Sequence, residues 1–171
     1  MRPAATIALR AGVITAAATA LVLGAVASPA SADSGQQRFA VSFDESPSLH
    51  VGGLGTGCPA FTGTLSELRH NEIEGFVNAD GTAHARTVAT ATITLVPDNN
   101  LMPSYTGSYA SRQTGTFDDA GATDRVVTTT VQGVIAGTDG STYGISELTH
   151  FSVDGQGTVR VWFDLMRCTP R

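Results

Sequence analysis

The segment 126–153, VVTTTVQGVIAGTDGSTYGISELTHFSV, decides the fold class. It contains two runs rich in valine, threonine and isoleucine on either side of Asp139-Gly140, a residue pair typical of tight hairpin turns. No ten-residue stretch after residue 32 has the period of a helix. The segment therefore predicts two antiparallel strands, 124–136 and 142–153, that are joined by a two-residue loop.

The same composition continues through the rest of the chain, with further turn signals at Asp80-Gly81 and at Asp154-Gly155-Gln156-Gly157. Short turns between long strands indicate a meander, and long strands favour a closed barrel, which has no exposed sheet edge. We expect an all-β, antiparallel up-and-down barrel of about eight strands, with a β-sandwich as the alternative. The glycine-rich stretch 47–60 is expected only to connect strands. The expected strands are 37–44, 61–69, 72–77, 82–95, 104–117, 124–136, 142–153 and 158–166.

The first 32 residues have the pattern of a secretory signal peptide. Arg2 and Arg10 supply positive charge, residues 11–26 are almost wholly apolar, and ASPASA at 27–32 ends in the small-x-small pattern of a cleavage site. The apolar run is shorter than the roughly 20 residues that a membrane-spanning helix needs. We expect cleavage after Ala32, an extracellular protein with no membrane anchor, and a single domain over residues 33–171.

The composition of residues 33–171 argues against two classes of partner. This part contains no lysine and has eight arginines against fifteen acidic residues, a net charge of −7. Nucleic acids and anionic membranes both require clustered cationic side chains. We therefore expect neither as a partner, and the sequence predicts no oligomeric state.

The chain has two cysteines, Cys58 and Cys168. An even pair in an oxidising compartment is most simply one disulfide, and neither residue has a base nearby in sequence that would make it a nucleophile. We expect Cys58 and Cys168 to form a disulfide.

Side-chain alternation separates the two titratable residues of the strand 142–153. Glu147 and His150 differ by an odd number of positions and therefore point to opposite faces. They are not expected to act as a catalytic pair. A two-residue loop at 139–140 would place Gln132 opposite Glu147, on a face that also contains Tyr143 and Phe151.

A three-residue loop at 155–157 would align the last strand with this face. Phe163 would then lie opposite Thr149, and Leu165 opposite Glu147. A register shifted by one residue would instead put Arg160, Trp162 and Asp164 on the apolar face, and we reject it for that reason.

These pairings give a hypothesis for a ligand site. A buried carboxylate is costly unless it is hydrogen-bonded or protonated, and Gln132 could donate to Glu147. The pair would hold the polar end of a ligand or transfer a proton; alternatively it is a satisfied structural pair, or the opposite face is the interior. The predicted ligand-binding residues are Glu147, Gln132, Tyr143, Phe151 and Phe163.

Other candidate sites are weaker. His70, Glu72 and Glu74 share one side of a strand, where they could bind a divalent cation, but a solvated outer face explains them better. No Gly-x-Ser-x-Gly motif supplies a hydrolase nucleophile. We expect no metal and no cofactor.

The leader ending in ASPASA, the GCPAF segment, the DGSTYGISELTHFSV strand and the final FDLMRC together resemble small exported proteins of actinobacteria. In outline the chain is similar to barrels of the allene oxide cyclase and lipocalin kind, although the lipocalin glycine-x-tryptophan signature is missing from RFAVSFD. The resemblance implies a barrel that encloses an apolar ligand, and it assigns no functional residue.

Three functions are compatible with these observations. The first is an extracellular binding module for a small apolar or amphipathic molecule. The second is a cyclase- or isomerase-type enzyme that uses Glu147 as acid or base. The third is a cell-surface structural or interaction protein with a fully packed interior.

Overall fold

The structure is a computed structural model that describes residues 36–117, 125–154 and 158–171. These residues form strands and loops, and among them no helix is long and apolar enough to cross a membrane. The strands are β1 (Gln37–Glu45), β2 (Ser48–Val51), β3 (Gly63–Val77), β4 (Ala83–Pro97), β5 (Tyr105–Phe117), β6 (Arg125–Gly137), β7 (Thr142–Val153) and β8 (Val159–Pro170).

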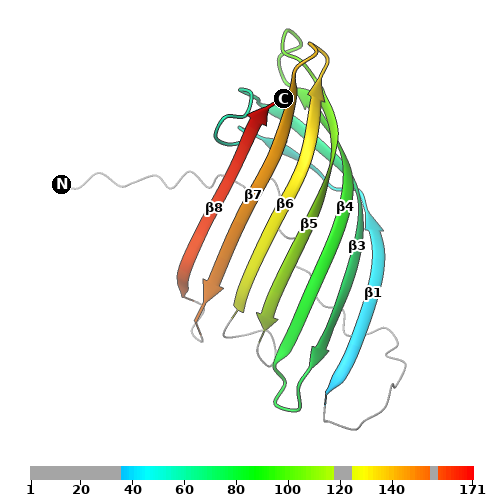
Figure 1. Ribbon diagram of the computed structural model, residues 1–171, viewed down its shortest axis with the longest axis vertical. Coiled ribbons are helices and arrows are strands. Elements are labelled where there is room, and N and C mark those ends of the chain that lie inside the picture. Colours follow the sequence, from blue (N-terminus) through cyan, green and yellow to red (C-terminus); the bar gives the residue numbers. More distant parts are fainter. Residues whose placement is uncertain (1–35, 118–124, 155–157) are drawn as a thin grey trace, which may run out of the picture.

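The eight strands form one antiparallel sheet with the order β1-β3-β4-β5-β6-β7-β8, and β2 also pairs with β3 (Figure 1). This confirms the prediction of an all-β, antiparallel meander. Over the described residues, β1 and β8 are not paired with each other, so the sheet is not closed into a barrel. Their outer edges lie on opposite sides of the view in Figure 1.

The first part of the sheet differs from the sequence prediction. β3 is one continuous strand of 15 residues, where two strands with a break near Asn71 were expected. β2 lies within the stretch 47–60, where only a connection was expected, and it pairs with the beginning of β3 while β1 pairs with the end. β1 and β2 therefore cover the same edge of β3 one after the other.

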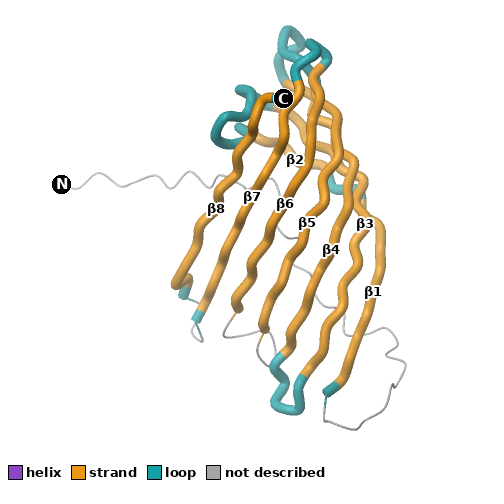
Figure 2. Tube along the Cα trace, in the orientation of Figure 1, coloured by secondary structure: helices purple, strands orange, loops and turns teal. Residues whose placement is uncertain are grey.

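One end of the sheet is tied across, and we call it the closed end. Thr56, just after β2, forms a parallel bridge with Arg167 of β8, and its N–H donates to the carbonyl of Met166 at 3.1 Å. The predicted disulfide between Cys58 and Cys168 is present beside this bridge and spans a sequence separation of 110. Figure 2 shows the loop after β2 beside the upper end of β8. At the opposite end, the open end, no such tie joins the described parts of β1 and β8.

The hydrophobic core lies at the closed end, on the face of the sheet that we call the inner face. Alternate residues of successive strands are buried there, as the pattern of β3 shows. The core contains side chains from every strand except β1, so curling the sheet is what brings them together. Its main members are Val51, Leu54, Phe61, Leu65, Ile93, Leu95, Tyr105, Ile135 and Ile145.

The hairpin between β6 and β7 has a three-residue loop, not the predicted two-residue loop. The N–H of Gly137 donates to the carbonyl of Ser141 at 2.7 Å, and the N–H of Gly140 donates to the carbonyl of Gly137 at 3.0 Å. Gly140 has a φ of 85°, the left-handed conformation that ends this type of loop. The Asp139 side chain accepts from the N–H of Ser141 at 3.0 Å and so stabilises it. The register is therefore shifted by one residue, and Glu147 lies opposite Val131.

The pairing of β8 also corrects the prediction. Val153 pairs with Val159, as expected, but a bulge follows, and from there Phe151 pairs with Trp162. Glu147 pairs with Met166, not with Leu165. The bulge thus produces the register that we rejected on pattern, with Trp162 and Asp164 on the inner face. The expected loop at 155–157 lies outside the described residues.

Candidate functional site

A band of polar side chains crosses the inner face, next to the apolar core. It contains two carboxylates, Glu67 of β3 and Glu147 of β7, whose residues are 3% and 5% exposed. Strand alternation places both carboxylates on the core side of the sheet. Buried carboxylates need compensation by hydrogen bonds, charge or protonation, so their surroundings define what the band can do.

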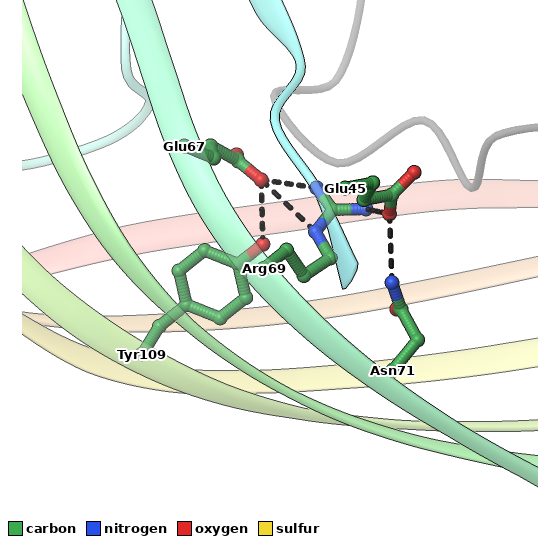
Figure 3. Close-up of polar contacts among 5 residues, drawn as sticks. All are labelled: Glu45, Glu67, Arg69, Asn71 and Tyr109. Atoms are coloured by element: carbon green, nitrogen blue, oxygen red, sulfur yellow. Dashed lines mark hydrogen bonds and ion pairs between the residues drawn. The ribbon is translucent and has the colours of Figure 1, made fainter. Parts of the chain in front are cut away.

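Glu67 is held by two neighbours, as Figure 3 shows. The Nε of Arg69 donates to its Oε2 at 3.0 Å, and the Nη2 of Arg69 donates to the same atom. The hydroxyl of Tyr109, from β5, also donates to Oε2, at 2.8 Å. These charge-assisted contacts fix the position of the Glu67 side chain.

Arg69 also reaches a second carboxylate. Its Nη1 donates to Oε1 of Glu45 at 3.1 Å, and Nδ2 of Asn71 donates to that oxygen at 2.9 Å. The side chain of Arg69 is 9% exposed. One guanidinium thus links Glu67 and Glu45, and Asn71, on the same side of β3, fixes the position of Glu45.

Tyr109 is a neutral hydrogen-bond donor in this cluster. Burial raises the pKa of its phenol well above the ordinary value, and the negative charge of Glu67 raises it further. The tyrosine fits closely because Gly133 lies opposite it on β6: a Cβ added to Gly133 would come within 2.7 Å of the Cβ of Tyr109.

Glu147 has a different environment. Oε1 accepts a hydrogen bond from the hydroxyl of Thr149 at 3.0 Å, and no arginine contacts the carboxylate among the described residues. Burial raises the pKa of Glu147 to about 7; the hydrogen bond from Thr149 opposes this shift, and the charges of Asp164 and Glu67 add to it. The contribution of Glu67 indicates that the two buried carboxylates lie within electrostatic reach of each other.

Each carboxylate also has one oxygen that is not satisfied. Over the part of the chain that the structure describes, Glu67 Oε1 and Glu147 Oε2 are buried and have no hydrogen-bond partner. Buried polar atoms are normally paired, so two such atoms on one face require an explanation. Both would be satisfied by a molecule that donates hydrogen bonds.

The structure brings together only part of the predicted ligand site. Glu147 is on the inner face, Tyr143 packs against the core 6.2 Å from the ring of Tyr105, and Phe151 is half-buried on the same face. Gln132 and Phe163 were assigned to the wrong face. The one-residue shift in the β6–β7 loop turns Gln132 to the outer face, where it is exposed, and the β8 bulge does the same to Phe163.

The prediction that Glu147 and His150 point to opposite faces is confirmed. His150 lies on the outer face, where its ring stacks on Phe163 with centroids 5.4 Å apart. Its Nδ1 is 2.8 Å from the hydroxyl of Thr128. These contacts account for His150 as part of a surface cluster.

The histidine and acidic residues considered for a metal site also lie on the outer face. His70 contacts Asp44 at 2.7 Å, and Glu74 pairs with Arg86 at 3.1 Å. No group of three or more histidine, cysteine, aspartate or glutamate side chains within the described ranges is arranged to hold a metal ion.

A hollow of about 760 Å³ is lined mostly by outward side chains such as Leu68, Thr92 and Gln132, and the residues Glu45, Arg69 and Tyr109 also border it. Leu68, Thr92 and Gln132 lie on the outer face and are exposed. The two unsatisfied carboxylate oxygens are not on this side of the sheet, so the inner face remains the candidate site.

The predicted ligand site did not include Glu67, Arg69, Tyr109, Asn71 or Glu45. For Glu67, Arg69 and Asn71 the signal was the run of alternate positions 65, 67, 69, 71 and 73 in LSELRHNEI, which begins and ends with an apolar residue and has polar or charged residues between. The assumed break near Asn71 concealed this run. No protein-family model, curated protein or solved structure matches the chain, so the assignment depends on the geometry alone.

Proposed function

We propose that the inner face binds a small amphipathic molecule. Its apolar part would pack against the core at the closed end, and its polar end would donate hydrogen bonds to Glu67 and Glu147. The observation that carries this proposal is the pair of buried, unsatisfied carboxylate oxygens beside an apolar cluster. Binding sites commonly combine an apolar wall with a few convergent polar groups.

The charge of the band specifies the polar end of the ligand. Glu45, Glu67, Glu147 and Asp164 supply four carboxyl groups, against the single guanidinium of Arg69. Above the pKa of Glu147 the unsatisfied atoms are both acceptors. The proposed ligand therefore has an amine or hydroxyl group at its polar end, and a carboxylate there would be repelled.

The curved sheet would act as the wall of a barrel of eight strands. Barrels of this size hold one small ligand or are filled by their own side chains. In the proposal, the Thr56–Arg167 bridge and the disulfide close the wall at one end, and the seam between β1 and β8 admits the ligand. The signal-peptide pattern and the disulfide are consistent with a protein that acts outside the cell.

The test uses native mass spectrometry followed by thermal shift measurements. Protein purified from the culture medium of its own host is expected to retain a small molecule, which native spectra would reveal. With ligand-free protein, octylamine and octan-1-ol should raise the melting temperature, whereas octanoate should not. Glu67→Gln and Glu147→Gln should each reduce the octylamine shift.

Glu72→Gln is the matched control, because Glu72 is an exposed glutamate on the outer face of the same strand as Glu67. Its octylamine shift should equal that of the unmodified chain. Equal shifts for the amine and the carboxylate, or a loss with Glu72→Gln as large as with Glu147→Gln, would refute the proposed site.

A second candidate function is proton transfer by Glu147 in a cyclase- or isomerase-type reaction. The pKa of about 7 favours it, because an acid or base works best when its pKa lies near the working pH. Under this reading Glu147→Gln would keep the ligand bound and abolish turnover. If Glu147→Gln loses the ligand and the unmodified chain shows no turnover, only the binding function remains.

A further inference from the structure

The first half of β8 is an unpaired sheet edge with exposed apolar side chains. No described strand pairs with β8 on the side away from β7 below the Thr56 bridge. Trp162 is 54% exposed. The other exposed large apolar residues in this segment are Val159, Val161, Phe163 and Leu165. Edges of this kind readily pair with another strand, so soluble proteins normally protect them. We call the segment Val159–Leu165 the β8 edge.

The bridge at the closed end shows which backbone groups of β8 point away from β7, in the plane of the sheet. Met166 accepts from Thr56 with its carbonyl, and Cys168 donates to Thr56 with its N–H. Backbone N–H and C=O groups alternate sides along a strand, so those of Trp162 and Asp164 also point away from β7. The β8 edge thus presents free-edge backbone donors and acceptors on the side away from β7, with Trp162 near its middle.

The sequence of the β8 edge, VRVWFDL, is complementary to itself in the antiparallel direction. If Trp162 lies opposite Trp162 of a second copy, Val161 lies opposite Phe163, and Arg160 lies opposite Asp164. A two-fold symmetric interface makes the Val161–Phe163 and Arg160–Asp164 contacts twice, and the Trp162 contact once on the axis. Opposite charges at facing positions stabilise strand pairing, and like charges oppose it.

We propose that the protein forms a symmetric dimer in which the β8 edges of two copies pair antiparallel about Trp162. Arg160 remains available for the contact: it pairs with Asp154 of its own chain, yet its side chain is 64% exposed. Arg160 is the extra residue of the bulge, so the regular pairing about Trp162 runs from Val161 to Phe163, and the contact between Arg160 and Asp164 lies at its margin. β1 is the less suitable edge, because Val41 is its one exposed large apolar residue.

Charge reversal tests the register of this dimer. Analytical ultracentrifugation of the purified, oxidised chain should give twice the chain mass. Arg160→Asp and Asp164→Arg would each place like charges opposite one another at two positions and should weaken dimerisation by about tenfold to a hundredfold. The double variant exchanges the charges within each chain and should restore the dimer.

Arg38→Asp, on the other edge strand, is the matched control and should leave the dimer unchanged. A chain that stays monomeric at every concentration overturns the proposal, as does a dimer that both single reversals leave intact. A double variant that keeps the melting temperature of the single variants but does not dimerise overturns it as well.

A second measurement does not depend on charged residues. Trp162→Cys places a thiol beside its own copy across the symmetry axis, so mild oxidation should produce a covalent dimer. Ser108→Cys, on the exposed outer face of β5, should not cross-link. Equal cross-linking of the two variants would contradict the proposed interface.

Discussion

Glu67 and Glu147 are the same residue type on the same face of one sheet, yet different groups surround their carboxyl groups. Both are nearly inaccessible to solvent, and each has one oxygen that finds no hydrogen-bond partner in the described part of the chain. Glu67 is neutralised by Arg69 and receives a hydrogen bond from Tyr109. Glu147 receives one hydroxyl and no cation among the described residues, so burial raises its pKa. Equal burial therefore leaves one carboxyl group in an ion pair and the other as a group that titrates near neutral pH.

The largest effect is expected when Glu67 loses its cation. Arg69→Met would leave the buried Glu67 and the half-buried Glu45 without charge compensation, and breaking a buried ion pair costs about 3–5 kcal/mol. Urea unfolding should show this loss. Arg86→Met removes an exposed pair with Glu74 and should cost less than about 1 kcal/mol. Comparable losses in the two variants would mean that the inner cluster is not the special environment described above.

The titration of Glu147 should make stability depend on pH. The folded protein holds the proton of Glu147 up to about pH 7, whereas the unfolded chain releases it near the ordinary pKa of 4.5. The folded state therefore binds more protons in this range, and the free energy of unfolding should fall with rising pH by roughly 3 kcal/mol.

Glu147→Gln isolates this contribution. The difference in free energy of unfolding between the variant and the unmodified chain should grow between pH 4.5 and pH 7 and then stay constant. Glu72→Gln serves as the exposed control. A difference for Glu147→Gln that does not change with pH would show that this carboxyl group is not shifted by burial.

A smaller loss is expected for Tyr109→Phe. It removes the phenol that donates to Glu67 and keeps the ring, and a hydrogen bond to a charged group contributes about 1.5–3 kcal/mol. Chemical denaturation can compare it with Tyr143→Phe, which changes a tyrosine outside the cluster. The two losses should differ; if they are equal, the phenol does not stabilise the anion.

The smallest effect is expected for Thr149→Val, which removes the hydroxyl that contacts Glu147. Because that hydrogen bond opposes the shift, the pKa of Glu147 should rise above about 7. The stability at pH 8 should fall by about 1 kcal/mol. Carbon-13 NMR titration of the glutamate side chains would measure the change, and a pKa that moves downward would contradict the assigned role of Thr149.

The sequence was sufficient for those features that depend on local patterns. Valine- and threonine-rich runs between turn pairs predicted the antiparallel meander, and the two cysteines predicted their disulfide. Alternation alone was enough to separate Glu147 from His150. These features do not require knowledge of which residues face each other on neighbouring strands.

Register could not be predicted in the same way. Asp139-Gly140 was interpreted as a complete loop, but Thr138 belongs to the loop as well, because Asp139 binds the N–H of Ser141 and Gly140 takes the left-handed conformation. The loop after Asn78 repeats this pattern, with Asp80 bonded to Thr82 and Gly81 at a φ of 86°. An Asp-Gly pair followed by serine or threonine therefore signals the longer loop. The β8 bulge has no comparable signal. The one-residue shift at the β6–β7 loop misplaced Gln132, and the bulge misplaced Phe163.

The bridge from Thr56 to β8 has a consequence for the order in which the chain can assemble. Each hairpin from β3 to β8 joins neighbours in sequence, so these pairs can form while the nascent chain is still growing. Cys58 must wait for Cys168, which is 110 positions later and within the last strand. A nascent or truncated chain that lacks β8 would therefore have a free thiol and an uncovered apolar cluster. The fold is complete only when β8 has been added and the disulfide has formed.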